Sequence, residues 1–154
     1  MWIVTGFAAA AAALLAAVCL VQPSQRTGVR GGWPELYDHT AMLCESAHAR
    51  LGLRVRLPAL GATAGVRLMH ERRGLRLELA AHTETERAHE AAFRAACKRN
   101  GLAPTARTRA RDRRRLLTAT LRGQPHEAGP TIAAVIDATF APGADPEIHI
   151  EWLA

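Results

Sequence analysis

The sequence predicts an α+β protein in which an N-terminal transmembrane helix precedes a small two-layer domain. Three observations lead to this prediction. The chain opens with an apolar run, residues 2–21, that contains no charged side chain. Several later segments alternate apolar and polar residues with a period of two, as half-buried strands do. Between these segments lie stretches with the start and stop signals of helices.

The apolar run matches the length of a membrane span, because about 20 apolar residues cross the hydrocarbon core as a helix. A cleaved signal peptide is the alternative. However, no Lys or Arg precedes the run, and no small-x-small cleavage site follows it. A lipoprotein signal would use Cys19, but Val18 is bulky where that motif needs a small residue. We therefore expect residues 1–22 to be a retained, single-pass anchor in the cell membrane.

The charges that flank the anchor predict its orientation. Arg26 and Arg30 follow the run, whereas only the α-amino group precedes it. By the positive-inside tendency, the C-terminal domain is expected in the cytoplasm. Residues 23–34 have the Gly, Pro and Ser content of a flexible linker. Trp33 within it is expected at the membrane interface, and packing against the domain is the alternative. The soluble α+β domain would then comprise residues 35–154.

The first part of this domain is expected to form an extra helix and two short strands. Residues 34–51 place apolar side chains near one helical face, and Gly52 would end that helix. Residues 53–57 alternate in the manner of a strand. A Gly/Ala-rich turn separates them from a second short strand over residues 66–70.

The second part, residues 74–154, contains a complete set of alternating strands and helices. Residues 74–81 alternate apolar and polar side chains, as a strand does. A helix then starts at a capping box over residues 83–86 and stops at Asn100-Gly101. Its buried face is expected to carry small side chains beside one aromatic ring: Ala88, Ala91, Ala92, Ala95, Ala96 and Phe93. Residues 105–111 and 115–122 alternate again. Pro130 is expected to open a second helix, which ends near Phe140, and residues 147–154 form the last strand.

The resulting order over residues 74–154 is β-α-β-β-α-β, which is the ferredoxin-like split βαβ arrangement. Its first and third strands are central, and its second and fourth strands lie at the edges. The arrangement predicts one core under the helices to which Leu77, Leu117, Ile150 and Trp152 contribute.

The stretch RTRARDRRR, residues 107–115, holds the densest positive charge in the chain. On the predicted second strand, Arg107, Arg109 and Arg111 would share the solvent side, opposite Ala106, Thr108 and Ala110 under the helices. Arg113, Arg114 and Arg115 would lie in and after the next turn. Charged edge strands resist pairing with other chains, so a solvated edge is the favoured interpretation. The alternative is that these arginines contact anionic lipid headgroups.

Composition does not single out a polyanion ligand. The net charge is +6, but all but one of the 20 basic residues are arginine and alanine is abundant, as a GC-rich coding sequence gives. The predicted central strands contain no aromatic residue on which nucleic-acid bases could stack. Nucleic acid is therefore not the expected partner.

Candidate chemistry is sparse. Cys44 and His48 are one helical turn apart, but His39 lies off their face, and a closed zinc site needs four ligands. Cys97 precedes Lys98, yet it lies near a helix C-terminus, which works against a thiolate. No P-loop, GxGxxG, GxSxG or HExxH motif occurs. The sequence therefore indicates no catalytic residue, metal or cofactor, and an enzyme is the less favoured class.

The favoured function is a noncatalytic, membrane-anchored binding or assembly module, with anionic lipid headgroups or a membrane protein as its partner. The open face of its sheet is expected to be polar: Arg76, Glu78, Arg107, Arg109, Arg111, Thr118, Thr120, His149 and Glu151. The alternative is a membrane-bound enzyme or small-ligand sensor with a pocket between the sheet and the helices. A pocket that gathers histidines with Cys44 or Cys97 would favour this alternative.

Overall fold

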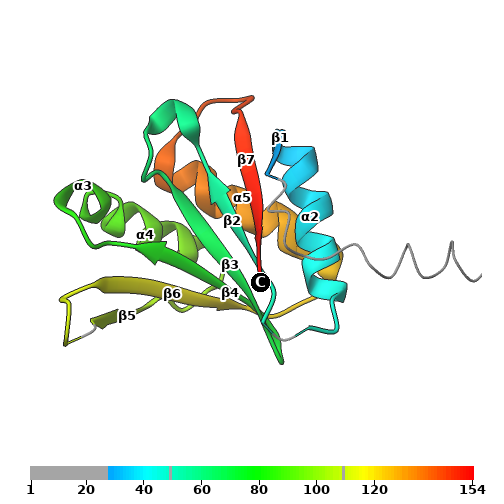
Figure 1. Cartoon of the computed structure of the whole chain (residues 1–154), viewed down its shortest axis with the longest axis horizontal. Helices are drawn as coiled ribbons and strands as arrows, with labels where there is room; N and C mark the ends of the chain where they lie inside the picture. Colours follow the sequence, from blue (N-terminus) through cyan, green and yellow to red (C-terminus); the bar gives the residue numbers. More distant parts are fainter. Residues whose placement is uncertain (1–27, 49, 109) are drawn as a thin grey trace, which may run out of the picture.

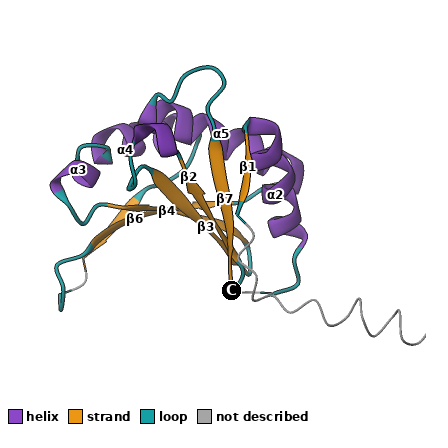
Figure 2. Ribbon diagram, turned by 45° about the horizontal axis from the view of Figure 1, so that its top comes forward, coloured by secondary structure: helices purple, strands orange, loops and turns teal. Residues whose placement is uncertain are grey.

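The computed structural model describes residues 28–48, 50–108 and 110–154, which form a single antiparallel sheet with helices on one face (Figures 1 and 2). The α+β class is therefore confirmed. The sheet has seven strands in the order β1-β7-β2-β3-β4-β6-β5. Their bounds are β1 Val29–Gly31, β2 Gly52–Arg56, β3 Gly65–Glu71, β4 Gly74–Ala80, β5 Thr105–Thr108, β6 Arg115–Leu121 and β7 Ile148–Leu153.

The helices lie together over one face of this sheet, as Figure 2 shows most clearly. They are α2 Trp33–Glu45, α3 Glu84–Arg87, α4 Glu90–Arg99 and α5 Pro125–Phe140, with a short 3-10 turn at Pro58–Leu60. Helix α5 packs against both α2 and α4. The alternate leucines, valines and isoleucines of the strands point into the space between sheet and helices and are almost completely buried.

The ferredoxin-like topology predicted for residues 74–154 is wrong in the place of its last strand. The first three strands of the predicted arrangement have the expected order, because β6 lies between β4 and β5. In the ferredoxin-like order β7 would pair with β4. Instead, β3 pairs with β4, and β7 pairs with β2 on the far side of the β2–β3 hairpin. Helix α5 therefore crosses three strands between β6 and β7.

The physical reason is the short connection between β3 and β4. Glu71 pairs with Gly74, so only Arg72 and Arg73 form the turn. Strands joined by so short a loop pair with each other, and this pairing occupies the edge of β4 that β7 would have used. A residue with a side chain does not fit at Gly74, because its φ is +142° and a Cβ there would lie 2.0 Å from the Leu121 carbonyl oxygen.

Several helix boundaries also differ from the prediction. Helix α2 ends at Glu45, so Ala47 and Leu51 lie beyond it. The capping box at Thr83 and Glu86 is confirmed, but it starts the short helix α3, and α4 begins separately at Glu90. Helix α5 begins at Pro125, and Pro130 lies inside it. The Asn100-Gly101 stop is confirmed, with Gly101 at φ +73°.

The buried face of the α3–α4 region is rotated relative to the prediction. Phe93, Ala96 and Cys97 are fully buried, whereas Ala88, Ala91 and Ala95 are exposed. The sequence pattern was ambiguous because alanine is common on every side of this helix. Phe93 and Cys97, one turn apart, fix the face that contacts the core.

Part of the predicted linker belongs to the fold. Strand β1 pairs with β7, and Trp33, which was expected at the membrane interface, packs against the core from the first turn of α2. Within the described residues, no helix is both long and apolar enough to cross a bilayer. The predicted anchor, residues 2–21, lies outside the described residues.

The core joins the four residues expected to share it. Leu77, Leu117 and Ile150 are at most 1% exposed, and Trp152 is partly buried against the same core from β7. Leu77→Ala should lower the free energy of unfolding by about 2–5 kcal/mol, because it leaves a cavity between β4 and the helices. Urea denaturation of the full chain measures this. Leu60→Ala is the control, since Leu60 is 45% exposed; equal effects would contradict this core.

Helices α2 and α5 approach closely at Gly129. A methyl group there would lie 2.8 Å from the Cα atom of Tyr37, so the backbone of α2 would have to move. Gly→Ala inside a helix normally stabilises by about 0.5–1 kcal/mol, but overpacking costs about 1–3 kcal/mol. We therefore expect Gly129→Ala to lower the melting temperature. Ala138→Ser on the exposed side of α5 should leave it nearly unchanged, and a stabilised Gly129→Ala variant would disprove the close approach.

Candidate anion-binding face of the sheet

The arginines of residues 107–115 do not form one surface. Arg107 is exposed on β5, and Arg111 and Arg113 lie in the turn that follows, with Arg113 at φ +52°. Arg109 lies outside the described residues. The edge position of β5 is confirmed, but its four residues are all exposed. The expectation that helices cover Ala106, Thr108 and Ala110 is therefore wrong, because all three residues are exposed and Ala110 lies in the turn after β5.

Two arginines of this stretch bind carboxylates. Arg114 forms an ion pair with Asp112 at 3.2 Å, and Arg115 forms one with Glu90 at the start of α4. Arg115 thus ties β6 to the helix layer, and Arg113 adopts the left-handed backbone that the turn needs. Much of this arginine run has a local structural role.

A different set of basic residues lies on the side of the sheet that the helices leave uncovered, which we call the open face. Its side chains alternate along each strand with those of the core. Its basic residues are Arg30, Arg54, Arg56, Arg67, Arg76, Arg107 and His149, which come from six strands. The polar side chains expected there on β4, β6 and β7 are confirmed at Arg76, Glu78, Thr118, Thr120, His149 and Glu151.

The strand register places four charged residues in one row across the open face. Glu151 pairs with Arg54 between β7 and β2, Arg54 with Arg67 between β2 and β3, and Arg67 with Glu78 between β3 and β4. Like charges directly opposite each other on neighbouring strands are destabilising. The Arg54–Arg67 pair is therefore an arrangement that sheet stability does not explain.

The carboxylates near these arginines are already in use. Glu151 accepts from Arg54 at 3.1 Å and lies 3.6 Å from Arg56. Glu78, although beside Arg67 in the register, is bound by Arg76 at 2.7 Å and is 7% exposed. Arg67 is exposed and forms no ion pair with any described residue. The β2–β3 part of the open face thus has more guanidinium groups than carboxylates.

A hollow of about 410 Å³ lies over these residues, and we call it the β2–β3 hollow. Basic side chains line it on several sides: Arg54, Arg56, Arg67, Arg114 and His82. Glu78 and Glu86 are its acidic residues, and Glu86 already accepts from the backbone N–H groups of His82 and Thr83 at 2.7 and 2.8 Å. Burial opposes ionisation of Glu86, but these hydrogen bonds outweigh it and lower its pKa. The hollow is therefore suited to an anion.

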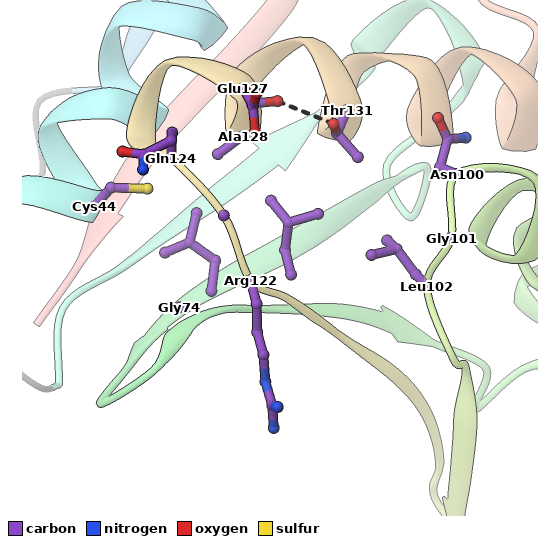
Figure 3. Close-up of a pocket in the computed structure, with 13 residues that line it drawn as sticks. Cys44, Gly74, Asn100, Gly101, Leu102, Arg122, Gln124, Glu127, Ala128 and Thr131 are labelled. Atoms are coloured by element: carbon purple, nitrogen blue, oxygen red, sulfur yellow. Dashed lines mark hydrogen bonds between the residues drawn. The ribbon is translucent and has the colours of Figure 1, made fainter.

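The space between sheet and helices offers much less. A cavity of about 160 Å³ lies beside Cys44, Leu102 and Gln124 (Figure 3). Figure 3 shows the Arg122 side chain extending away from it. The cavity is smaller than typical ligand pockets of about 300–1,000 Å³. No histidine lines it, so it does not gather the histidine–cysteine set that an enzyme or sensor was expected to show.

The histidines are dispersed. His48 lies outside α2, and His39 accepts a hydrogen bond from the indole N–H of Trp152 at 3.2 Å. His89 contacts the ring of Phe140 in a tilted arrangement, with ring centroids 4.7 Å apart, and His149 lies 2.7 Å from Glu147. Among the described residues, no group of three His, Cys, Asp or Glu side chains could hold a metal ion. The His39–Cys44–His48 set is thus not brought together as ligands.

The arginines of the β2–β3 hollow can be recognised in the sequence, because they alternate with apolar residues. The position of their strands in the sheet cannot be read from this pattern. Arg54 and Arg56 alternate with buried Leu53 and Val55, and Arg67 alternates with Val66 and Leu68. The prediction places these two short strands outside the ferredoxin-like core. Only their insertion beside β4 places their arginines at the centre of the open face.

Comparisons with protein families, curated proteins and solved structures give no match for this chain.

Both described cysteines are expected to be poor nucleophiles. Burial raises the pKa of the Cys97 thiol to about 11 and also raises that of Cys44. At pH 8 the thiolate fraction of Cys97 is therefore about 0.1%, and its side chain is inaccessible. We expect iodoacetamide to modify Cys97 only after unfolding, as followed by mass spectrometry in buffer and in urea. Rapid alkylation of native Cys97 would reopen a catalytic role.

Proposed function

We propose that this protein is a noncatalytic binding module that is held at a membrane by residues 2–21 and binds an anionic partner through the open face. In this proposal the apolar run is a single transmembrane helix, and the α+β domain lies in the cytoplasm, on the side indicated by Arg26 and Arg30. The tether would keep the open face near one bilayer surface.

The observation that carries the proposal is the unpaired positive charge at the centre of the open face. Antiparallel sheets often expose one face to water, so an uncovered face alone has no functional meaning. Here, however, Arg54 and Arg67 face each other directly, and Arg67 has no carboxylate partner among the described residues. An anion bound between them would relieve their repulsion and form charge-assisted hydrogen bonds with them.

Two arginines of residues 107–115 extend this surface. Arg107 lies on the open face at the β5 edge, and Arg114 lines the β2–β3 hollow. The partner could be anionic lipid or an acidic surface of a membrane protein. RNA is less suitable, because the open-face positions of β4 and β6 are Arg76, Glu78, Ala80, Leu116, Thr118 and Thr120, none of which is aromatic.

The proposal can be tested with a photoreactive amino acid in the full chain in its native membrane. At Thr118, on the open face, it should crosslink to a lipid or an acidic membrane protein. At Ala138, on the exposed side of α5, it should give little product. Adding Arg54→Gln and Arg67→Gln should reduce the Thr118 product severalfold, because both guanidinium groups are lost. Equal crosslinking from both positions would contradict binding through the open face.

Whether the apolar run is retained as an anchor can be tested separately in the same membrane preparation. Mass spectrometry of the membrane-extracted chain should find the N-terminus intact. A mature N-terminus beyond residue 17 would show that the apolar run is removed, and the tethering part of the proposal would then be wrong.

A further inference from the structure

The β2–β3 hollow has the composition of a phosphate-binding site. Arg54, Arg56 and Arg67 project into it from two adjacent strands, and Arg114 lines it from the β6 side. Arg54 and Arg56 share one carboxylate, that of Glu151, and Arg67 has no ion pair among the described residues. Guanidinium groups bind phosphate oxygens through paired hydrogen bonds. We infer that this hollow binds the phosphate groups of anionic phospholipids in the membrane that holds the chain.

The position of the hollow relative to the proposed anchor supports a lipid source for the phosphate; this step rests on the proposed function. Only residues 22–28 separate the apolar run from β1, and a segment of that length spans at most about 25 Å. Strands lie about 4.8 Å apart, so β3, three strands from β1, is about 14 Å from it. The hollow is therefore within reach of the headgroup layer.

The open face continues toward the anchor with further positive charge. Arg30 on β1 pairs with His149 on β7, and His149 pairs with Arg56 on β2. This row leads from the first described strand to the hollow. A membrane surface that meets Arg30 can therefore also meet Arg56 and Arg67 without a change in the fold.

The strength of the effect follows from the number of arginines involved. Each arginine close to an anionic surface raises the affinity about fivefold. Loss of Arg54, Arg56 and Arg67 should therefore weaken binding about 100-fold at low ionic strength. Salt should also release the domain, because these exposed charges are screened.

The experiment uses the full chain in vesicles, with a protease site introduced between residues 22 and 28. Before cleavage, the chain should float with vesicles of phosphatidylcholine alone and with vesicles that also contain phosphatidylglycerol. After cleavage, the released domain should stay only with phosphatidylglycerol and should leave at high salt. The variant Arg54→Gln/Arg56→Gln/Arg67→Gln should lose this retention. The variant Arg87→Gln/Lys98→Gln/Arg99→Gln removes the same charge from exposed positions of helices α3 and α4, away from the open face, and should keep most of this retention.

The outcomes separate the two proposals. If the uncleaved chain floats with neither vesicle, the membrane tether of the proposed function fails. If it floats but the cleaved wild-type domain leaves phosphatidylglycerol at low salt, only the lipid assignment fails. Equal losses in both triple variants would show a response to net charge and would overturn the assignment to the hollow. Arginine-specific labelling with phenylglyoxal provides a second readout, in which phosphatidylglycerol should protect Arg67. Protection by inorganic phosphate but not by this lipid would overturn the lipid source.

Discussion

The pairing of β3 with β4 is the constraint on which the rest of this structure depends. A two-residue turn joins these strands, and it commits one edge of β4 to its neighbour in sequence. The last strand then finds its partner on β2, and α5 must cross β4, β3 and β2 to reach it. The same pairing places the arginines of β2 and β3 in the middle of the open face.

The helix layer explains why one face of the sheet is apolar and buried and the other is polar and uncovered. Helices α2, α4 and α5 lie side by side on one face, and Gly129 lets α5 approach the backbone of α2 closely. Most apolar side chains of the strands are therefore buried on a single side, although Leu116 lies on the open face. The opposite face is mainly polar, and several of its charged residues pair with one another, as Arg54 does with Glu151 and Arg76 with Glu78. Its central arginines cost stability where they oppose each other.

The ion pairs that each arginine forms say more about where this protein could bind an anion than its net charge does. The positive balance of the chain follows its arginine-rich composition, and several arginines of residues 107–115 are used in turns and ion pairs. Arg67 differs because the carboxylate nearest in register, Glu78, is bound by Arg76. A count of charges could not have distinguished Arg67 from the arginines that form ion pairs, because the distinction depends on which side chains contact each other in the fold.

The sequence by itself determined the α+β class, most strands, the capping box at Thr83 and the stop at Gly101, because periodicity and capping are local properties. It also indicated the alternation of Arg54, Arg56 and Arg67 with buried residues. It could not determine the neighbour of β4, the true face of α4 or the start of α5. These depend on pairing and packing between residues far apart in sequence. Only the tertiary structure decided that Arg54 and Arg67 lie opposite each other, because that pairing exists only once β2 and β3 are aligned in register.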